Sequence, residues 1–128
     1  MKIVFDTSIF IDYLRGGTIG EEVFDQIEKQ NAQLFIPTMV IFELFSGKST
    51  KDYSVRVKIT KMIQDFKRIE LTEEIAIMAG KLYREIGKQV GTQDYIIAAS
   101  ALSIGASVLT LNQKHFQQIP GLDLYENI

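Results

Sequence analysis

Three carboxylates stand in apolar surroundings, where soluble proteins rarely place an unpaired charge. Asp6 ends an apolar run that is typical of a buried first strand, and Glu43 interrupts the apolar run of residues 39–45. Asp94 lies near the start of residues 93–104, the most apolar helix-like stretch of the chain. A buried carboxylate costs free energy unless it is hydrogen-bonded, ion-paired or bound to a metal. No Lys or Arg lies within one helical turn of Glu43, so a local ion pair does not explain it.

Each acid taken alone has a simpler explanation. Asp6 could cap the following helix, Glu43 could point to solvent, and Asp94 could favour a helix N-terminus through the helix dipole. Carboxylates that are brought together repel one another, which raises their pKa values unless a cation joins them. Because the chain has no Cys and one His, an oxygen-only site suits Mg²⁺ or Mn²⁺ better than Zn²⁺. Such a site is typical of phosphoryl-transfer enzymes.

The elements that must position these acids alternate along the chain. Strand-like runs are followed by helix-like runs, which predicts an α/β fold with a mostly parallel central sheet flanked by helices. Sites in such sheets form at the carboxyl ends of the strands, and Asp6 lies at such an end. We expect strands at residues 2–5, 33–36, 68–71, 107–110 and 122–125.

The composition narrows the class of protein. The 128 residues contain two prolines and no linker-like segment, so residues 1–128 are expected to form one domain. The absence of Cys excludes disulfides and thiol catalysis and fits a cytoplasmic location. No apolar run approaches the roughly 20 residues of a membrane span, and we expect no membrane association. The net charge of −2 argues against a general nucleic-acid coat protein.

Basic residues nevertheless gather in one part of the chain. Seven of the 14 Lys and Arg lie between Lys48 and Arg68, with only Asp52 and Asp65 among them. Such a stretch is either a solvated helix face or a surface that faces phosphate groups.

Four motifs, in the right order and spacing, resemble those of the PIN-domain ribonucleases, in particular the VapC-type toxins of VapBC toxin–antitoxin systems. The resemblance covers the whole chain. The motifs are FDTS at residues 5–8, ELFSG at residues 43–47, DYIIAA at residues 94–99, and the tail at residues 105–122 with its L-T-x-N and P-G-L signatures.

This resemblance implies a three-layer PIN-like fold and a metal-dependent endoribonuclease. Asp6, Glu43 and Asp94 would be the catalytic residues that hold Mg²⁺ or Mn²⁺, so that water attacks an RNA phosphodiester. The supporting residues would be Thr7, Ser8 and Thr110. The resemblance also implies a VapB-like antitoxin as partner and a homodimer.

The chain departs from the family pattern at one point. Many relatives carry a fourth acid in the tail, where this chain has Asn112 and His115. Asn112 can still offer an amide oxygen to Mg²⁺. His115 is either a supporting residue that could bind Mn²⁺ or move a proton, or a surface residue in a helical turn. A less negative site would lower metal affinity or turnover.

Two surfaces follow from this interpretation. A phosphodiester chain must approach an acidic site that repels it, and the basic residues expected to offset this repulsion are Arg15, Lys51, Arg56 and Lys58. The antitoxin is expected in an apolar groove between the helix at residues 21–30 and the helical stretch at residues 39–66. Phe24 and Phe45 would line that groove or belong to the core.

Three other functions deserve comparison. A haloacid-dehalogenase-type phosphatase needs a second Asp two residues after the first, where this chain has Ser8. A signal-receiver domain needs adjacent acids near the end of the first strand, and these are missing. The remaining alternative is a catalytically weakened PIN fold that binds RNA or a partner without cutting. The missing fourth acid motivates it, and the retention of Asp6, Glu43 and Asp94 argues against it.

Overall fold

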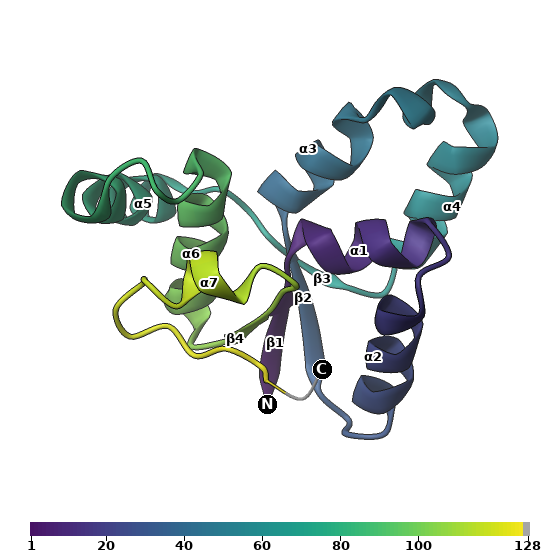
Figure 1. Cartoon of the computed structure of the whole chain (residues 1–128), viewed down its shortest axis with the longest axis horizontal. Helices are drawn as coiled ribbons and strands as arrows, with labels where there is room; N and C mark the ends of the chain where they lie inside the picture. The colour runs from purple at the N-terminus through teal and green to yellow at the C-terminus, as the bar shows by residue number, and fades with distance from the viewer. Residues whose placement is uncertain (127–128) are drawn as a thin grey trace.

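A four-stranded parallel sheet forms the centre of the molecule, with the strand order β3-β2-β1-β4 (Figure 1). The computed structural model describes residues 1–126. Within the sheet, Val4 pairs with Phe35 on one side and with Val108 on the other, so the first strand is central. The strands are β1 (Lys2–Phe5), β2 (Gln33–Pro37), β3 (Lys67–Ile69) and β4 (Ser107–Leu109).

Helices lie on both sides of this sheet, which confirms the predicted three-layer α/β fold. Figure 1 shows α1 and α2 on one side of the strands, with α5, α6 and α7 on the other. Helix α3, the 3₁₀ helix η1 and helix α4 form an arm that rises from the carboxyl end of the sheet (Figure 1). The bounds are α1 (Thr7–Leu14), α2 (Thr18–Glu28), α3 (Thr38–Ser46), η1 (Lys48–Lys51), α4 (Tyr53–Ile63), α5 (Glu73–Ile86), α6 (Thr92–Ile104) and α7 (Gln113–Phe116).

Helix α6 is buried almost all round, as its lack of a polar face predicts. Ile97, Ala98, Ala99 and Ala101 are fully buried. Small side chains let this helix lie close to its neighbours, and its largest set of contacts is with α5. Asp94, in the first turn of α6, is therefore attached to a helix that is held by packing on most sides.

An aromatic cluster anchors the other side of the sheet. The ring centroids of Phe5 and Phe66 lie 4.9 Å apart, and those of Phe10 and Phe66 lie 5.2 Å apart. Phe24 of α2 joins them, with its centroid 5.3 Å from that of Phe5. The cluster joins β1, α1, α2 and the turn between α4 and β3, and Asp6 directly follows its Phe5.

Helices α1 and α2 cross closely at a glycine. A Cβ atom on Gly20 would lie 3.0 Å from the backbone nitrogen of Tyr13 and 3.1 Å from the carbonyl oxygen of Ile9. The Gly20 N–H donates to Asp12 Oδ2 at 2.7 Å. This crossing sets the position of α2 relative to α1.

The predicted strand at residues 122–125 is wrong. This segment makes one bridge, in which Val108 pairs with Leu124. Gly121, at a φ of 77°, ends the preceding turn, and the chain then touches β4 only briefly. Two backbone hydrogen bonds of 2.9 Å, Val108 N to Asp123 O and Tyr125 N to Val108 O, hold it there. The other four strands form within two residues of their predicted positions.

No helix among residues 1–126 combines the length and the apolar character that crossing a membrane requires.

Candidate active site

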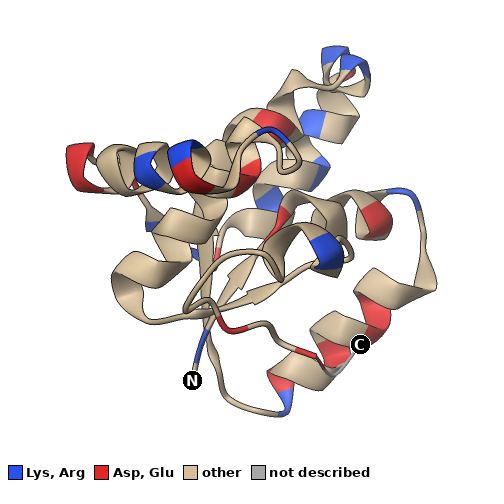
Figure 2. Cartoon of the chain, turned by 60° about the vertical axis from the view of Figure 1, so that its left-hand side comes forward, with Lys and Arg blue, Asp and Glu red and all other residues tan. Residues whose placement is uncertain are grey.

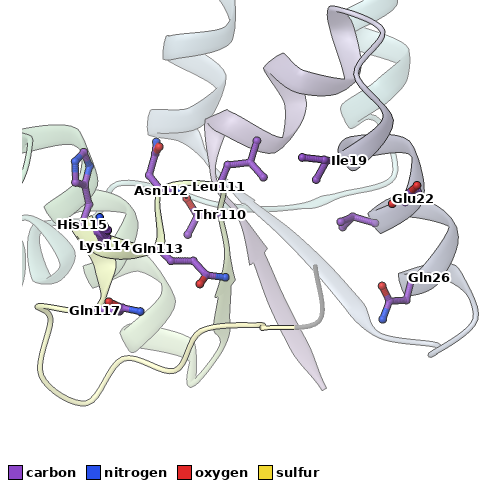
Figure 3. Close-up of a pocket in the computed structure, with 11 residues that line it drawn as sticks. Ile19, Glu22, Gln26, Thr110, Leu111, Asn112, Gln113, Lys114, His115 and Gln117 are labelled. Atoms are coloured by element: carbon purple, nitrogen blue, oxygen red, sulfur yellow. Dashed lines mark hydrogen bonds between the residues drawn. The ribbon is translucent and has the colours of Figure 1, made fainter.

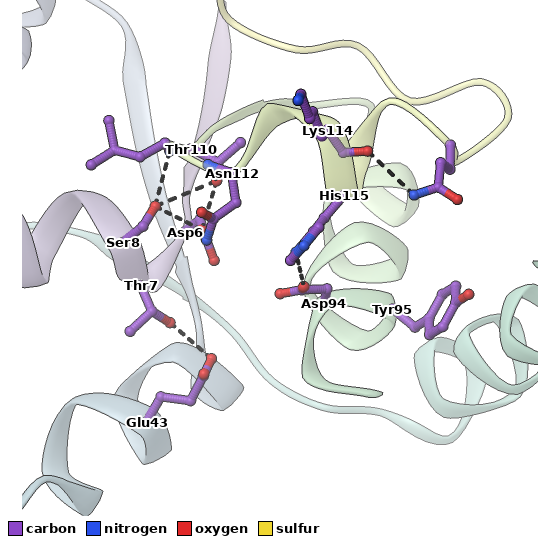
Figure 4. A network of polar contacts seen from close by, with 12 residues as sticks. Asp6, Thr7, Ser8, Glu43, Asp94, Tyr95, Thr110, Asn112, Lys114 and His115 are labelled. Carbon is purple, nitrogen blue, oxygen red and sulfur yellow. Dashed lines mark hydrogen bonds and ion pairs between the residues drawn. The ribbon is translucent and has the colours of Figure 1, made fainter. Parts of the chain in front are cut away.

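Asp6 lies at the carboxyl end of the central strand and is only 3% exposed. Its backbone N–H donates to Leu109 O at 2.9 Å, which continues the pairing of β1 with β4. The Asp6 side chain does not cap helix α1, although the residue occupies the N-cap position. Instead its Oδ2 accepts hydrogen bonds from Ser8 Oγ at 2.9 Å and from Thr110 Oγ1 at 2.7 Å (Figure 4). The simple capping explanation for Asp6 therefore fails.

The two hydroxyl groups that hold Asp6 are themselves oriented by the backbone. Ser8 Oγ accepts from the Leu111 N–H at 3.0 Å, and Thr110 Oγ1 accepts from the Asn112 N–H at 2.9 Å. Each hydroxyl accepts from an amide and donates to the carboxylate, so its proton points at Asp6. Both bonds end on Oδ2, and Oδ1 has no hydrogen-bond partner among the described residues. One carboxylate oxygen is thus positioned and left free for a ligand.

Glu43 reaches the same place from helix α3. Its Oε1 accepts from Thr7 Oγ1 at 2.8 Å, and the residue is only partly buried (Figure 4). Partial burial is the main cause that raises the pKa of Glu43 above its ordinary value. The Thr7 hydrogen bond opposes this rise, whereas the charges of Asp6 and Asp94 add to it. Glu43 therefore interacts electrostatically with both other acids, and its side chain does not simply point into solvent.

Asp94 enters from the first turn of helix α6. Its Oδ2 lies 3.1 Å from Nδ1 of His115, which is carried by α7 (Figure 4). Burial, followed by the charge of Asp6, raises the pKa of Asp94, and the contact with His115 partly offsets this rise. His115 is thus in contact with one of the three acids, at a position where relatives were expected to carry a fourth.

The three acids line one open pocket of about 510 Å³. Thr7, Ser8, Asn112 and His115 line it too, whereas Thr110 is 1% exposed and lies behind Asp6. The structure therefore brings every predicted acid and support residue together. Sequence reasoning missed four further lining residues, Ile11, Asp12, Gln93 and Leu111.

The position of Asp12 could have been found from helical spacing. Ser8, Asp12 and Arg15 lie four and three residues apart, which places them on one face of α1. All three line the pocket. Leu111 had no comparable signal because it lies in the loop after β4.

The donor atoms of the pocket suit a hard divalent cation. Within residues 1–126, none of the three acids forms an ion pair with Lys or Arg. Burial is the main cause of the raised pKa values of Glu43 and Asp94, and the charges of neighbouring acids add to it. In this part of the chain no three Asp, Glu, His or Cys residues stand close enough to form a complete metal cage. Mg²⁺ does not need one, because it keeps several waters and takes one or two carboxylates together with substrate phosphates.

The predicted basic residues lie in three different places. Arg15 lines the acidic pocket itself, whereas Lys58 lines a groove between α2 and α4. Arg56 donates to the carbonyl oxygens of Thr50 and Lys51 at 2.7 and 3.0 Å, so its guanidinium also has a structural task. Lys51 is exposed in η1. Figure 2 shows Lys and Arg gathered along the arm of η1 and α4.

Comparisons with known proteins agree with this architecture. The family model of the PIN domain matches residues 3–122. Ribonuclease VapC1 of Rickettsia felis is 32% identical over 133 residues, which cover 97% of this chain and 95% of the relative. Ribonuclease VapC19 of Mycobacterium tuberculosis is 29% identical over 126 residues, which cover 95% of this chain and 97% of the relative.

A solved structure extends this similarity to three dimensions. A chain in the structure of VapBC-1 from nontypeable Haemophilus influenzae has a TM-score of 0.80 and 26% identity, covering 98% of this chain and 97% of that chain. The family match spans most of the sequence, and the relatives match over nearly their full length. The chain therefore belongs to the PIN-domain family, among the relatives of the VapC ribonucleases.

Proposed function

We propose that this protein is an endoribonuclease that depends on Mg²⁺ or Mn²⁺ and acts as the toxin of a type II toxin–antitoxin pair. Asp6, Glu43 and Asp94 are its catalytic, metal-binding residues. The observation that carries the proposal is their convergence in one pocket without a Lys or Arg ion-pair partner among residues 1–126. The ribonuclease names of its full-length relatives support RNA as the substrate.

The chemistry of the site divides between the cation and the protein. A bound Mg²⁺ or Mn²⁺ supplies Lewis acidity toward the phosphate oxygens and lowers the pKa of water. The protein keeps the carboxylates fixed before substrate arrives: Ser8 and Thr110 orient Asp6, and Thr7 orients Glu43. Ligand orientation of this kind tunes the affinity of a site for its metal.

The remaining polar residues of the pocket address the substrate and the third acid. Arg15 borders the pocket and offsets its repulsion of an RNA phosphate. His115 orients Asp94 through Nδ1. Asn112 is exposed and lines the pocket, where its amide oxygen can complete the coordination of the cation.

The decisive experiment is RNA cleavage by purified protein with Mg²⁺, Mn²⁺ or EDTA. The substrates include transfer RNA, because a relative from Salmonella typhimurium is named a tRNA(fMet)-specific endonuclease. Asp6→Asn should abolish the cleavage, while Asp65→Asn, which changes an exposed carboxylate beyond the pocket, should leave it intact. Absence of both cutting and Mn²⁺ binding would overturn the proposal in favour of a PIN fold that binds without cleaving.

The antitoxin is proposed to occupy the groove that α1, α2 and α4 form. This groove has a volume of about 490 Å³, and Tyr13, Phe24 and Met62 supply its apolar surface. Tyr13 is 37% exposed, so it offers apolar area without being part of the closed core. Tyr13→Ala should weaken binding of the co-expressed VapB-like antitoxin, whereas Ile77→Ala on α5 should not. Equal antitoxin affinity in the two variants would remove the groove from the proposal.

A homodimer in the cytoplasm completes the proposal. Phe42 of α3 and Ile77 of α5 are 68% and 54% exposed, so their apolar side chains are available for a contact between two copies of the chain. Replacing both by Ser should convert a dimer into a monomer in analytical ultracentrifugation. A wild-type protein that already sediments as a monomer would refute this part.

A further inference from the structure

A second pocket lies directly beside the acidic one. It has a volume of about 680 Å³ and separates helix α2 from the segment that runs from the end of β4 through α7 (Figure 3). Leu111, Asn112 and His115 line both pockets, so the two form neighbouring sites along one surface. If an RNA chain has a phosphate at the acids, a nucleotide next to that phosphate can reach this second pocket.

The lining of this pocket is a mixture that suits a nucleobase. Ile19 and Leu111 are 43% and 37% exposed and offer apolar contact. Gln26 of α2 faces Gln113 and Gln117 across the pocket, and these three side-chain amides make no hydrogen bond within residues 1–126 (Figure 3). Single-stranded RNA is recognised by apolar or stacking contact with the base faces and by hydrogen bonds to the base edges.

The pocket offers one carboxylate that can recognise the edge of a base. Glu22 of α2 contributes a carboxylate, and Lys114 is the one Lys or Arg side chain among the lining residues. A carboxylate repels a phosphate but accepts hydrogen bonds from N–H groups. Guanine presents two adjacent donors, N1–H and the N2 amino group, beside the O6 acceptor. Two carboxylate oxygens match those donors, and a Gln amide matches O6.

The wall that carries Glu22 has a fixed position relative to the acids. Gly20 packs against the backbone of α1 and donates to Asp12, which itself lines the acidic pocket. The opposite wall follows Thr110, which holds Asp6. Both walls are thus tied to the residues that position the proposed catalytic carboxylates, as a specificity pocket requires.

We propose that this second pocket binds the base of the nucleotide next to the scissile phosphate and selects guanine, with Glu22 as the specificity-determining residue. The inference rests on the proposed ribonuclease function, because that function places RNA phosphate at the acids. It adds a sequence preference that the carboxylates themselves do not provide.

Titration of ¹⁵N-labelled protein with GMP, AMP, CMP and UMP in EDTA tests the pocket without requiring cleavage. The four nucleotides share their phosphate, so differences between them report the base. GMP should bind about fivefold more tightly or better, in line with the lower end of bidentate base recognition. Its largest amide shifts should fall on Glu22, Gln26 and Gln113. Glu22→Gln should remove the preference, whereas Glu21→Gln, the adjacent acid outside this pocket, should retain it.

The inference would be overturned by equal affinity for the four nucleotides, by shifts located elsewhere, or by guanine selectivity that survives Glu22→Gln. No shift at millimolar GMP would do so as well. These results are independent of the RNA cleavage assay with Asp6→Asn. Cleavage without base selectivity would refute the pocket alone, and selective GMP binding supports the pocket even where no RNA is cut.

Discussion

Thr110 offers the sharpest test of how the fold supports its acids. Its buried hydroxyl donates to Asp6 Oδ2 at 2.7 Å and accepts from the Asn112 N–H at 2.9 Å. Thr110→Val removes both hydrogen bonds. Because Val has nearly the same shape as Thr, the substitution leaves no cavity. A hydrogen bond to a charged group contributes about 1.5–3 kcal/mol. The Asn112 N–H also loses its acceptor, in a hydrogen bond that is partly buried. The expected loss of stability is therefore about 2–3 kcal/mol.

Two measurements check this prediction. Thermal unfolding should show a fall in Tm on the order of 10 °C for a chain of this size. The affinity for Mn²⁺ should fall by about 10–100-fold, because a partner that orients a ligand has been lost. Thr60→Val is the matched control: Thr60 donates to Arg56 O at 2.9 Å on the exposed face of α4. If the two variants had the same Tm and the same Mn²⁺ affinity, Thr110 would not be positioning Asp6.

Three further predictions follow from burial and charge. In metal-free protein the pKa of Glu43 is raised above its ordinary value of 4.5, so the folded state favours the protonated form. The stabilisation that this gives is fully present below about that pH and is lost as the pH rises through the folded-state pKa. Glu43→Gln should therefore raise the urea midpoint at pH 7 but not below about pH 4; a gain at both would contradict this. Tyr95 is buried and donates to Gly87 O at 2.6 Å, so Tyr95→Phe should cost about 1 kcal/mol in urea unfolding; an unchanged midpoint would show that bond to be unimportant. Lys51→Gln combined with Lys58→Gln should lower RNA affinity and reduce the slope of log affinity against log salt by about 1.4; filter binding across salt concentrations that returns an unchanged slope would remove both residues from the RNA path.

Much of the site could be predicted because strand ends and helix starts meet at one edge of a parallel sheet. The apolar surroundings of Asp6, Glu43 and Asp94 marked each of them as unusual, and the sheet topology then brings them together. The direction of the supporting hydrogen bonds was not predictable in the same way. Thr7 bonds to Glu43 and not to its neighbour Asp6 because consecutive residues at the start of a helix point in different directions.

The parts that escaped prediction depend on contacts between distant segments. Residues 122–125 carry a strand-like pattern but meet β4 at only one bridge. The pocket beside the acids is missed for the same reason, since Glu22 and Gln113 come from opposite ends of the chain. Neither wall has an unusual local sequence pattern, so only the folded structure shows that Glu22 and Gln113 line one pocket.

The hydrogen bond between Asp6 and Thr110 joins residues 104 positions apart, and this separation sets when the site can exist during protein synthesis. Ribosomes add about 5–20 residues per second, so roughly 5–20 s pass between the synthesis of these two residues. In that interval β1 can pair with β2, but its other edge lacks β4 and Asp6 lacks one of the hydroxyls that orient it. A partly translated chain thus carries no completed site, and an enzyme proposed to cut RNA is finished only after most of its own message has been read.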